Sequence, residues 1–179
     1  AIFSPYEPGA VFKAITVAGA LDQDKVTPKS TYEDAGEIKY GEHLIKNSDE
    51  QAHGVQTMTQ VLELSLTTGA IFAMEQIGKD KFKEYVNNFG FGRMTGIELE
   101  TEQAGNISSL EKRGDIFAAT ASFGQGITAT PLQVAAAFAA IANGGRLVKP
   151  YIVDKIVSSD GSERIGKSEV VNQVISART

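Results

Sequence analysis

The first residues that suggest chemistry are Lys13 and the position three residues before it, Ala10. Lys13 is the only charged residue in the apolar segment 10–21. Burial disfavours the charged form of lysine and lowers its pKa, so a buried lysine can act as a base. Residues three apart share a helix face, and a serine at position 10 would be activated by that base, but the residue there is alanine. The alternative is that Lys13 reaches solvent from the helix edge and does no chemistry.

A second pair of candidate groups consists of the hydroxyls of Ser65 and Thr67. Both lie in the largely apolar stretch 57–77, for which we predict a single helix. In one interpretation they bond back to carbonyls of the preceding helical turn and do nothing more. In the other they line a polar cleft. The spacing leaves both interpretations open.

A third feature is the segment SFGQGITATP at 122–131, which has two glycines before a predicted helix. A Gly-x-Gly turn ahead of a helix can hold an anion at the helix N-terminus. This segment lacks the lysine and hydroxyl residue of a phosphate-binding loop, and no clear strand precedes it. We therefore interpret it as a tight packing turn.

The composition argues against several classes of protein. The net charge is −5 and the lysines and arginines are scattered, which argues against a nucleic-acid partner. The absence of cysteine excludes disulfides, thiolate metal sites and cysteine nucleophiles. His43 and His53 have no second ligand at helical spacing, which indicates surface residues rather than a metal site, and we expect no cofactor. No segment has the ~20 apolar residues of a membrane-spanning helix.

Helix caps and apolar periodicity predict the main helices. Thr57 with Gln60, and Thr130 with Gln133, have the spacing of a capping box. Pro131 suits the first position of the second of these helices. We expect helices at 10–21, 57–77, 79–89 and 131–142, a further one within 109–123, and a last one that begins near Glu169.

Strands are expected to follow the helices, mainly between Arg146 and Ile165. We also expect a short hairpin around 38–44, within an otherwise irregular region, and a short strand at 97–99. Helices that come first and strands that cluster at the end indicate an α+β fold. The length of 179 residues is enough for one domain with its own core.

Together these segments resemble the transpeptidase domain of class B penicillin-binding proteins. YEPGAVFK at 6–13 resembles the family's YEPGSxFK, which contains its Ser-x-x-Lys motif. SLTTG at 65–69 resembles its Ser-x-Asn element, and segments 89–97 and 122–145 match later stretches in the same order. The resemblance covers essentially the whole chain. It implies mainly the helical part of a penicillin-binding-protein/β-lactamase-like fold, with a few strands near the C-terminal end.

The resemblance also implies a D,D-transpeptidase reaction that cross-links peptidoglycan. A serine attacks the penultimate D-alanine of a stem peptide, and an amine of a neighbouring strand then takes the acyl group; β-lactams trap the same serine. Lys13 corresponds to the general base, and Ser65 to the hydroxyl that passes a proton to the leaving group. The family geometry predicts that Ala10, Lys13 and Ser65 face one another, with the Lys13 amine within hydrogen-bond reach of the Ser65 hydroxyl. The expected partner is a stem peptide or a β-lactam. The parent protein is expected to be extracytoplasmic and anchored in the membrane by segments outside this chain.

Three departures from the family pattern lead us to expect no catalytic activity. Ala10 stands at the nucleophile position and Thr67 at the position of the motif asparagine, which would hold the substrate backbone. Lys-Thr-Gly does not occur in the chain. We therefore expect one partial domain, 1–179, without the Lys-Thr-Gly strand and the rest of the central sheet. The alternative is a non-catalytic binding or assembly module on the same scaffold.

Overall fold

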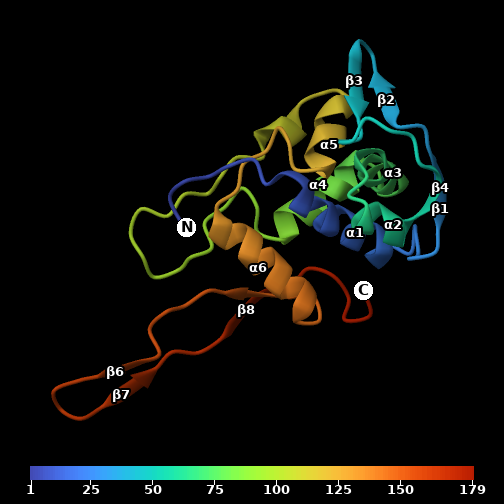
Figure 1. Cartoon of the computed structure of the whole chain (residues 1–179). Helices are drawn as coiled ribbons and strands as arrows, with labels where there is room; N and C mark the ends of the chain where they lie inside the picture. The colour runs from blue at the N-terminus through green and yellow to red at the C-terminus, as the bar shows by residue number, and fades with distance from the viewer.

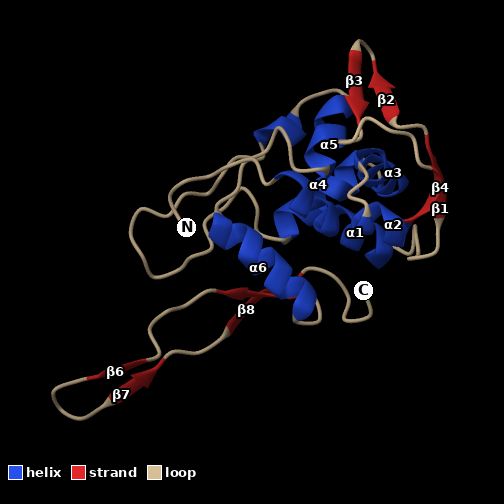
Figure 2. Ribbon diagram, viewed as in Figure 1, coloured by secondary structure: helices blue, strands red, loops and turns tan.

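The computed structural model describes all 179 residues as a helical body with an extended strand-built arm (Figure 1). The strands lie at the edges and the helices in the middle (Figure 2). The helices and 3-10 turns are η1 (Gly9–Phe12), α1 (Lys13–Asp22), α2 (Met58–Glu63), α3 (Thr67–Ile77), α4 (Lys79–Asn88), η2 (Ser108–Glu111), α5 (Asp115–Ser122) and α6 (Pro131–Ala142). The strands are β1 (Thr31–Asp34), β2 (Glu37–Tyr40), β3 (His43–Lys46), β4 (Gly54–Thr57), β5 (Arg146–Lys149), β6 (Lys155–Val157), β7 (Glu163–Ile165) and β8 (Glu169–Gln173).

Helix α1 is the central element of the body. It packs against α3, α4 and α6, and most of its residues are buried, as expected for a segment that is apolar around its whole circumference. At Gly19 an added Cβ would lie 3.1 Å from the ring of Tyr85. A glycine there lets α1 and α4 approach closely.

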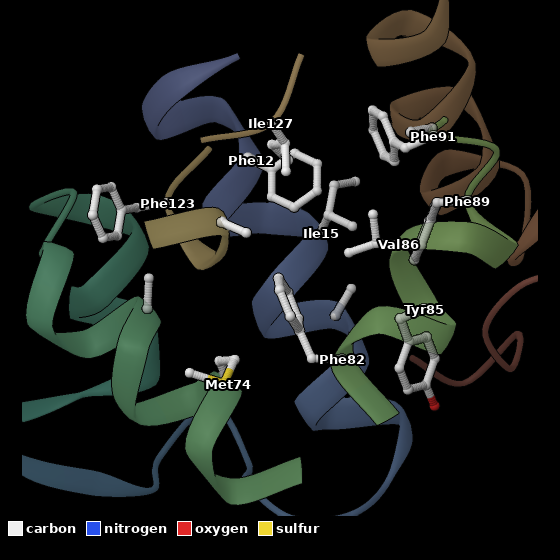
Figure 3. Close-up of a cluster of buried hydrophobic side chains, with 14 of the residues drawn as sticks. Phe12, Ile15, Met74, Phe82, Tyr85, Val86, Phe89, Phe91, Phe123 and Ile127 are labelled. Atoms are coloured by element: carbon white, nitrogen blue, oxygen red, sulfur yellow. The ribbon is translucent and has the colours of Figure 1, made fainter. Parts of the chain in front are cut away.

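The main core gathers side chains from η1, α1, α3, α4, α5 and α6, and part of it is shown in Figure 3. The rings of Phe12 and Phe91 meet edge to face, with their centroids 4.9 Å apart, a favoured arrangement for aromatic pairs. Phe12 is 1% exposed and directly precedes Lys13. The core therefore fixes the backbone that carries the candidate lysine.

Most of the helix predictions are confirmed. The capping boxes of Thr57 and Thr130 are both formed, α6 has the predicted bounds, and α4 and α5 lie within theirs. The prediction for 10–21 holds, with a 3-10 turn as its first part. The prediction of one helix over 57–77 is wrong, because the chain breaks between α2 and α3.

The strands form four antiparallel pairs, β1–β4, β2–β3, β5–β8 and β6–β7, and no larger sheet. The hairpin expected around 38–44 is confirmed as β2–β3. The expectation that strands lie mainly between Arg146 and Ile165 is wrong, because half of them lie in 31–57. The helix expected near Glu169 is also wrong: this segment is β8, which pairs with β5. Residues 97–99 form no strand.

The hairpin β6–β7 extends away from the helical body (Figure 1). All six of its strand residues are exposed, including the apolar side chains of Ile156, Val157 and Ile165. Mixed helices and strands in separate regions of the chain give the predicted α+β class. None of the helices combines the length and the apolar character that are needed to cross a membrane.

Candidate active site

Lys13 is buried and hydrogen-bonded entirely to neutral oxygens. Its side chain is 3% exposed. Its Nζ donates to the backbone carbonyl of Ser65, to Ser65 Oγ at 3.1 Å and to Thr67 Oγ1 at 3.4 Å. Burial without a neighbouring carboxylate lowers the pKa of Lys13 to about 8. The prediction that the lysine amine meets the Ser65 hydroxyl is confirmed, and the alternative that Lys13 extends into solvent is wrong.

Ser65 lies in the break between α2 and α3, not inside a helix. Its φ is +55°, a left-handed conformation that a non-glycine residue adopts only at a cost of about 1–3 kcal/mol. This conformation ends α2 and lets the carbonyl and the hydroxyl of Ser65 both reach Lys13. The interpretation in which Ser65 bonds to the preceding helical turn is therefore wrong, because its hydroxyl contacts Lys13 on α1.

Ala10 and Thr67 line the same pocket as Lys13, which encloses about 300 Å³. Ala10 belongs to η1 and is exposed, and its side chain is a methyl group with no oxygen to offer. Thr67 is the first residue of α3 and is 5% exposed. The three positions come from two distant segments of the sequence. All three line one cleft, which therefore brings Ala10 and the buried Lys13 to the same cavity.

One wall of this pocket comes from the β2–β3 hairpin and the residues after it. Leu44, Ile45, Lys46 and Ser48 all line the pocket. Sequence analysis predicted the hairpin but gave no indication that it borders the site, because the placement depends on tertiary packing. Lys46 brings a second ammonium group to the pocket, although it also lies 3.6 Å from Glu50.

The pocket is also lined by Thr120, Phe123 and Gln125, at the end of α5 and in the glycine-rich turn. No acidic residue lines the pocket. The two positive charges and the neutral donors and acceptors suit a ligand that carries carbonyl or carboxylate oxygens.

The glycine-rich turn is a packing turn, as predicted. Gly124 has φ of +77°, and an added Cβ would lie 2.3 Å from the carbonyl oxygen of Gly9. The Gly9 amide donates to the Gly124 carbonyl at 3.0 Å, and the Gly126 amide donates to Glu7 at 2.9 Å. The turn therefore holds the segment that leads into Ala10 and Lys13.

The family model of the penicillin-binding protein transpeptidase domain matches residues 1–179. Among curated relatives, stage V sporulation protein D of Bacillus subtilis is 37% identical over 181 residues, covering 99% of this chain and 28% of the relative. Penicillin-binding protein PbpB of Mycobacterium tuberculosis is 30% identical over 181 residues, covering 100% of this chain and 26% of the relative. The chain thus spans little more than a quarter of these relatives.

Solved structures give the same result for the fold. The chain resembles the crystal structure of penicillin-binding protein 3 from Mycobacterium tuberculosis, complexed with aztreonam, with a TM-score of 0.91. The two are 28% identical, and the match covers 99% of this chain and 40% of the solved one. The arrangement of helices around Lys13 is therefore one that occurs in larger proteins with the same domain.

Proposed function

Because this chain belongs to the penicillin-binding protein transpeptidase family, we propose that it contains the part of a D,D-transpeptidase site that supplies the general-base lysine. We further propose that Ala10 prevents the acylation step in this chain. The observation behind the proposal is a buried lysine, with no carboxylate partner, that lines the same pocket as the methyl group of Ala10. Such a site can bind an acyl donor but has no oxygen at position 10 with which to attack it.

In the family reaction a serine oxygen forms a bond to the carbonyl carbon of the penultimate D-alanine. The serine proton passes to the lysine, and the bond to the last D-alanine breaks as its nitrogen receives a proton. We assign the base role to Lys13, because a pKa of about 8 leaves a useful fraction of neutral amine near neutral pH. We assign the relay of the proton to Ser65, whose Oγ lies 3.1 Å from the Lys13 amine.

Thr67 takes the position of the motif asparagine. A threonine hydroxyl offers one donor, whereas an asparagine amide offers two donors and an acceptor. Thr67 Oγ1 also accepts a hydrogen bond from Lys13. We propose that this substitution weakens the hold on the substrate backbone, so that the chain departs from its family in substrate binding as well as in acylation.

The proposed ligands are peptidoglycan stem peptides and their β-lactam mimics. Aztreonam, bound in the Mycobacterium tuberculosis structure, supports the second class. The names of the relatives, which include a sporulation protein and penicillin-binding proteins, support an extracytoplasmic place in cell-wall synthesis. Anchoring in a membrane would come from segments outside these 179 residues.

The test is covalent labelling. After long exposure to benzylpenicillin, intact-mass measurement of the unmodified chain should show no adduct, because Ala10 has no nucleophilic oxygen. Loss of the nucleophile from a catalytic unit costs on the order of 10⁶ in rate in a serine protease. A stable adduct on the unmodified chain would contradict the proposal and would point to another nucleophile.

A second candidate function is favoured by the paired departures at Ala10 and Thr67: a module that binds stem peptides without reacting. Saturation-transfer NMR with a peptide that ends in D-Ala-D-Ala tests this binding function. Binding without turnover supports this module. Absence of binding, together with absence of a penicillin adduct, leaves the scaffold a role in assembly.

A further inference from the structure

Helix α3 is capped by a side chain that lies far away in the sequence. The residue at its N-cap position, Leu66, makes no side-chain hydrogen bond to the helix. Instead, Asn47 Oδ1 accepts hydrogen bonds from the amides of Thr67 at 2.9 Å and Thr68 at 3.2 Å. The first amides of a helix have no partner within it. Asn47 therefore supplies the bonds that a serine, threonine or aspartate at the N-cap usually provides.

Asp34 determines which way the Asn47 amide points. Both carboxylate oxygens accept from Asn47 Nδ2, at 3.0 and 2.8 Å, and Thr68 Oγ1 donates to Asp34 at 2.7 Å. Asp34 is 1% exposed and Asn47 is 3% exposed. With its nitrogen held by a carboxylate, the amide of Asn47 must present its oxygen to α3.

Asn47 lies between two residues that line the pocket. Its neighbours Lys46 and Ser48 both line the cavity, whereas Asn47 does not. Its side chain points inward to the start of α3, whose Thr67 contacts Lys13. One buried amide thus connects the pocket wall to the oxygens around the lysine.

We propose that Asn47, oriented by Asp34, is a positioning residue of the site. It holds the Ser65–Thr67 segment against Lys13 and fixes the wall that Lys46 and Ser48 form. Loss of Asn47 frees the start of α3 and admits water to the lysine amine. The inference concerns the same site as the proposed function, but it rests on the contacts of Lys13 and needs no covalent chemistry.

The test is an NMR titration of the lysine 13Cε signals in the unmodified chain and in Asn47→Ala, with Lys13→Met used to assign the Lys13 signal. In Asn47→Ala we expect the Lys13 pKa to rise by about one unit from about 8, as hydration of the ammonium group increases. The matched control is Thr57→Ala, which removes the cap of the neighbouring helix α2 without touching any partner of Lys13. Thr57→Ala should destabilise the fold and leave the Lys13 pKa unchanged.

A second measurement uses the unmodified chain, so it does not depend on the folding of the variant. Hydrogen exchange should show protection of the Thr67 and Thr68 amides, which would exchange rapidly at an uncapped helix start. Rapid exchange of both amides, or an unchanged Lys13 pKa in folded Asn47→Ala, would overturn the inference. A penicillin adduct on the unmodified chain would contradict the proposed function but leave this inference standing.

Discussion

Two buried charged groups contact adjacent residues at the start of α3, Lys13 at Thr67 and Asp34 at Thr68, and their surroundings differ. Asp34 accepts hydrogen bonds from four neutral groups: the amides of Gly36 and His53, the side-chain amide of Asn47 and the hydroxyl of Thr68. Lys13 has only neutral oxygens as partners, and the longest of its contacts is 3.4 Å. Neither has an oppositely charged partner within 4 Å.

The two groups differ in that only Lys13 lines a pocket. Lys13 and Thr67 line the cavity of about 300 Å³, whereas Asp34 and Thr68 do not. Adjacent residues of one helix, Thr67 and Thr68, thus contact Lys13 at the pocket and Asp34 away from it. Full hydrogen bonding makes the buried carboxylate rigid and stabilising, whereas burial without an anionic partner lowers the pKa of the Lys13 amine at the edge of the pocket. The comparison predicts that substitution of Asp34 lowers the stability of the fold, whereas substitution of Lys13 does not.

The largest effect is expected from removal of the two charges. Asp34→Ala leaves several buried donors without an acceptor and should reduce the free energy of unfolding by about 3–5 kcal/mol. Lys13→Met removes a buried cation that has no counter-ion, so it should change stability by less than about 1 kcal/mol or increase it. Urea unfolding of both variants measures this, with Asp154→Ala in the exposed arm as a control. Equal destabilisation by both variants would contradict the comparison.

The next largest effect is a pH dependence of stability that is caused by Lys13. Its pKa is about 8 in the folded chain, against 10.5 for an ordinary lysine. Below pH 8 both states carry the proton, and folding pays the full cost of burying the charge. Between about pH 8 and 10.5 the unfolded state binds more protons, so stability rises with pH by up to ~3 kcal/mol.

Other groups also titrate in this range, so the measurement is the difference between the unmodified chain and Lys13→Met in urea unfolding at pH 7, 8.5 and 10. Burial raises the pKa of Tyr32 to about 12 in the folded chain, but both proteins contain this tyrosine, so its contribution cancels in the difference. A difference that stays constant across the three pH values would show that Lys13 is not desolvated in solution.

A smaller effect should separate the two threonines at the start of α3. Thr68→Val removes a buried hydroxyl that donates to Asp34 at 2.7 Å and meets the Tyr32 hydroxyl at 3.0 Å. The expected loss is about 1–2 kcal/mol. Thr67→Val removes only the 3.4 Å contact with Lys13, and the expected loss is under about 0.5 kcal/mol. Both variants keep the volume and the backbone amide bonds to Asn47, and the reverse order in urea unfolding would contradict the assignment.

The features that sequence analysis predicted are those with local causes. The caps at Thr57 and Thr130 lie within the helices they start, and the glycine-rich turn follows from its own residues. The break at Ser65 was missed because α3 is capped by Asn47, twenty residues earlier. Strand β8 was mistaken for a helix because its pairing with β5 lies outside the local pattern. The contact of Lys13 with Ser65 was predicted only through the resemblance to a family, since spacing alone left Lys13 ambiguous.

The smallest effect is expected from Ala10→Ser, which restores a hydroxyl at the nucleophile position. This variant tests whether Lys13 and Ser65 are sufficient for acylation. Ala10→Ser places a hydroxyl at the position three residues before Lys13, on the same pocket. A base with a pKa of about 8 is then available. In the proposed site, however, the backbone of an acyl donor would meet Thr67 instead of an asparagine amide, and no Lys-Thr-Gly sequence occurs in these 179 residues. Catalytic groups that act as a unit give little rate enhancement when only some of them are present.

Fluorescent penicillin should therefore label Ala10→Ser only in trace amounts, and Ala10→Ser with Lys13→Met not at all. Rapid stoichiometric labelling of Ala10→Ser would show instead that Lys13 and Ser65 support acylation without further residues. Ala10 alone would then account for the lack of acylation in the unmodified chain.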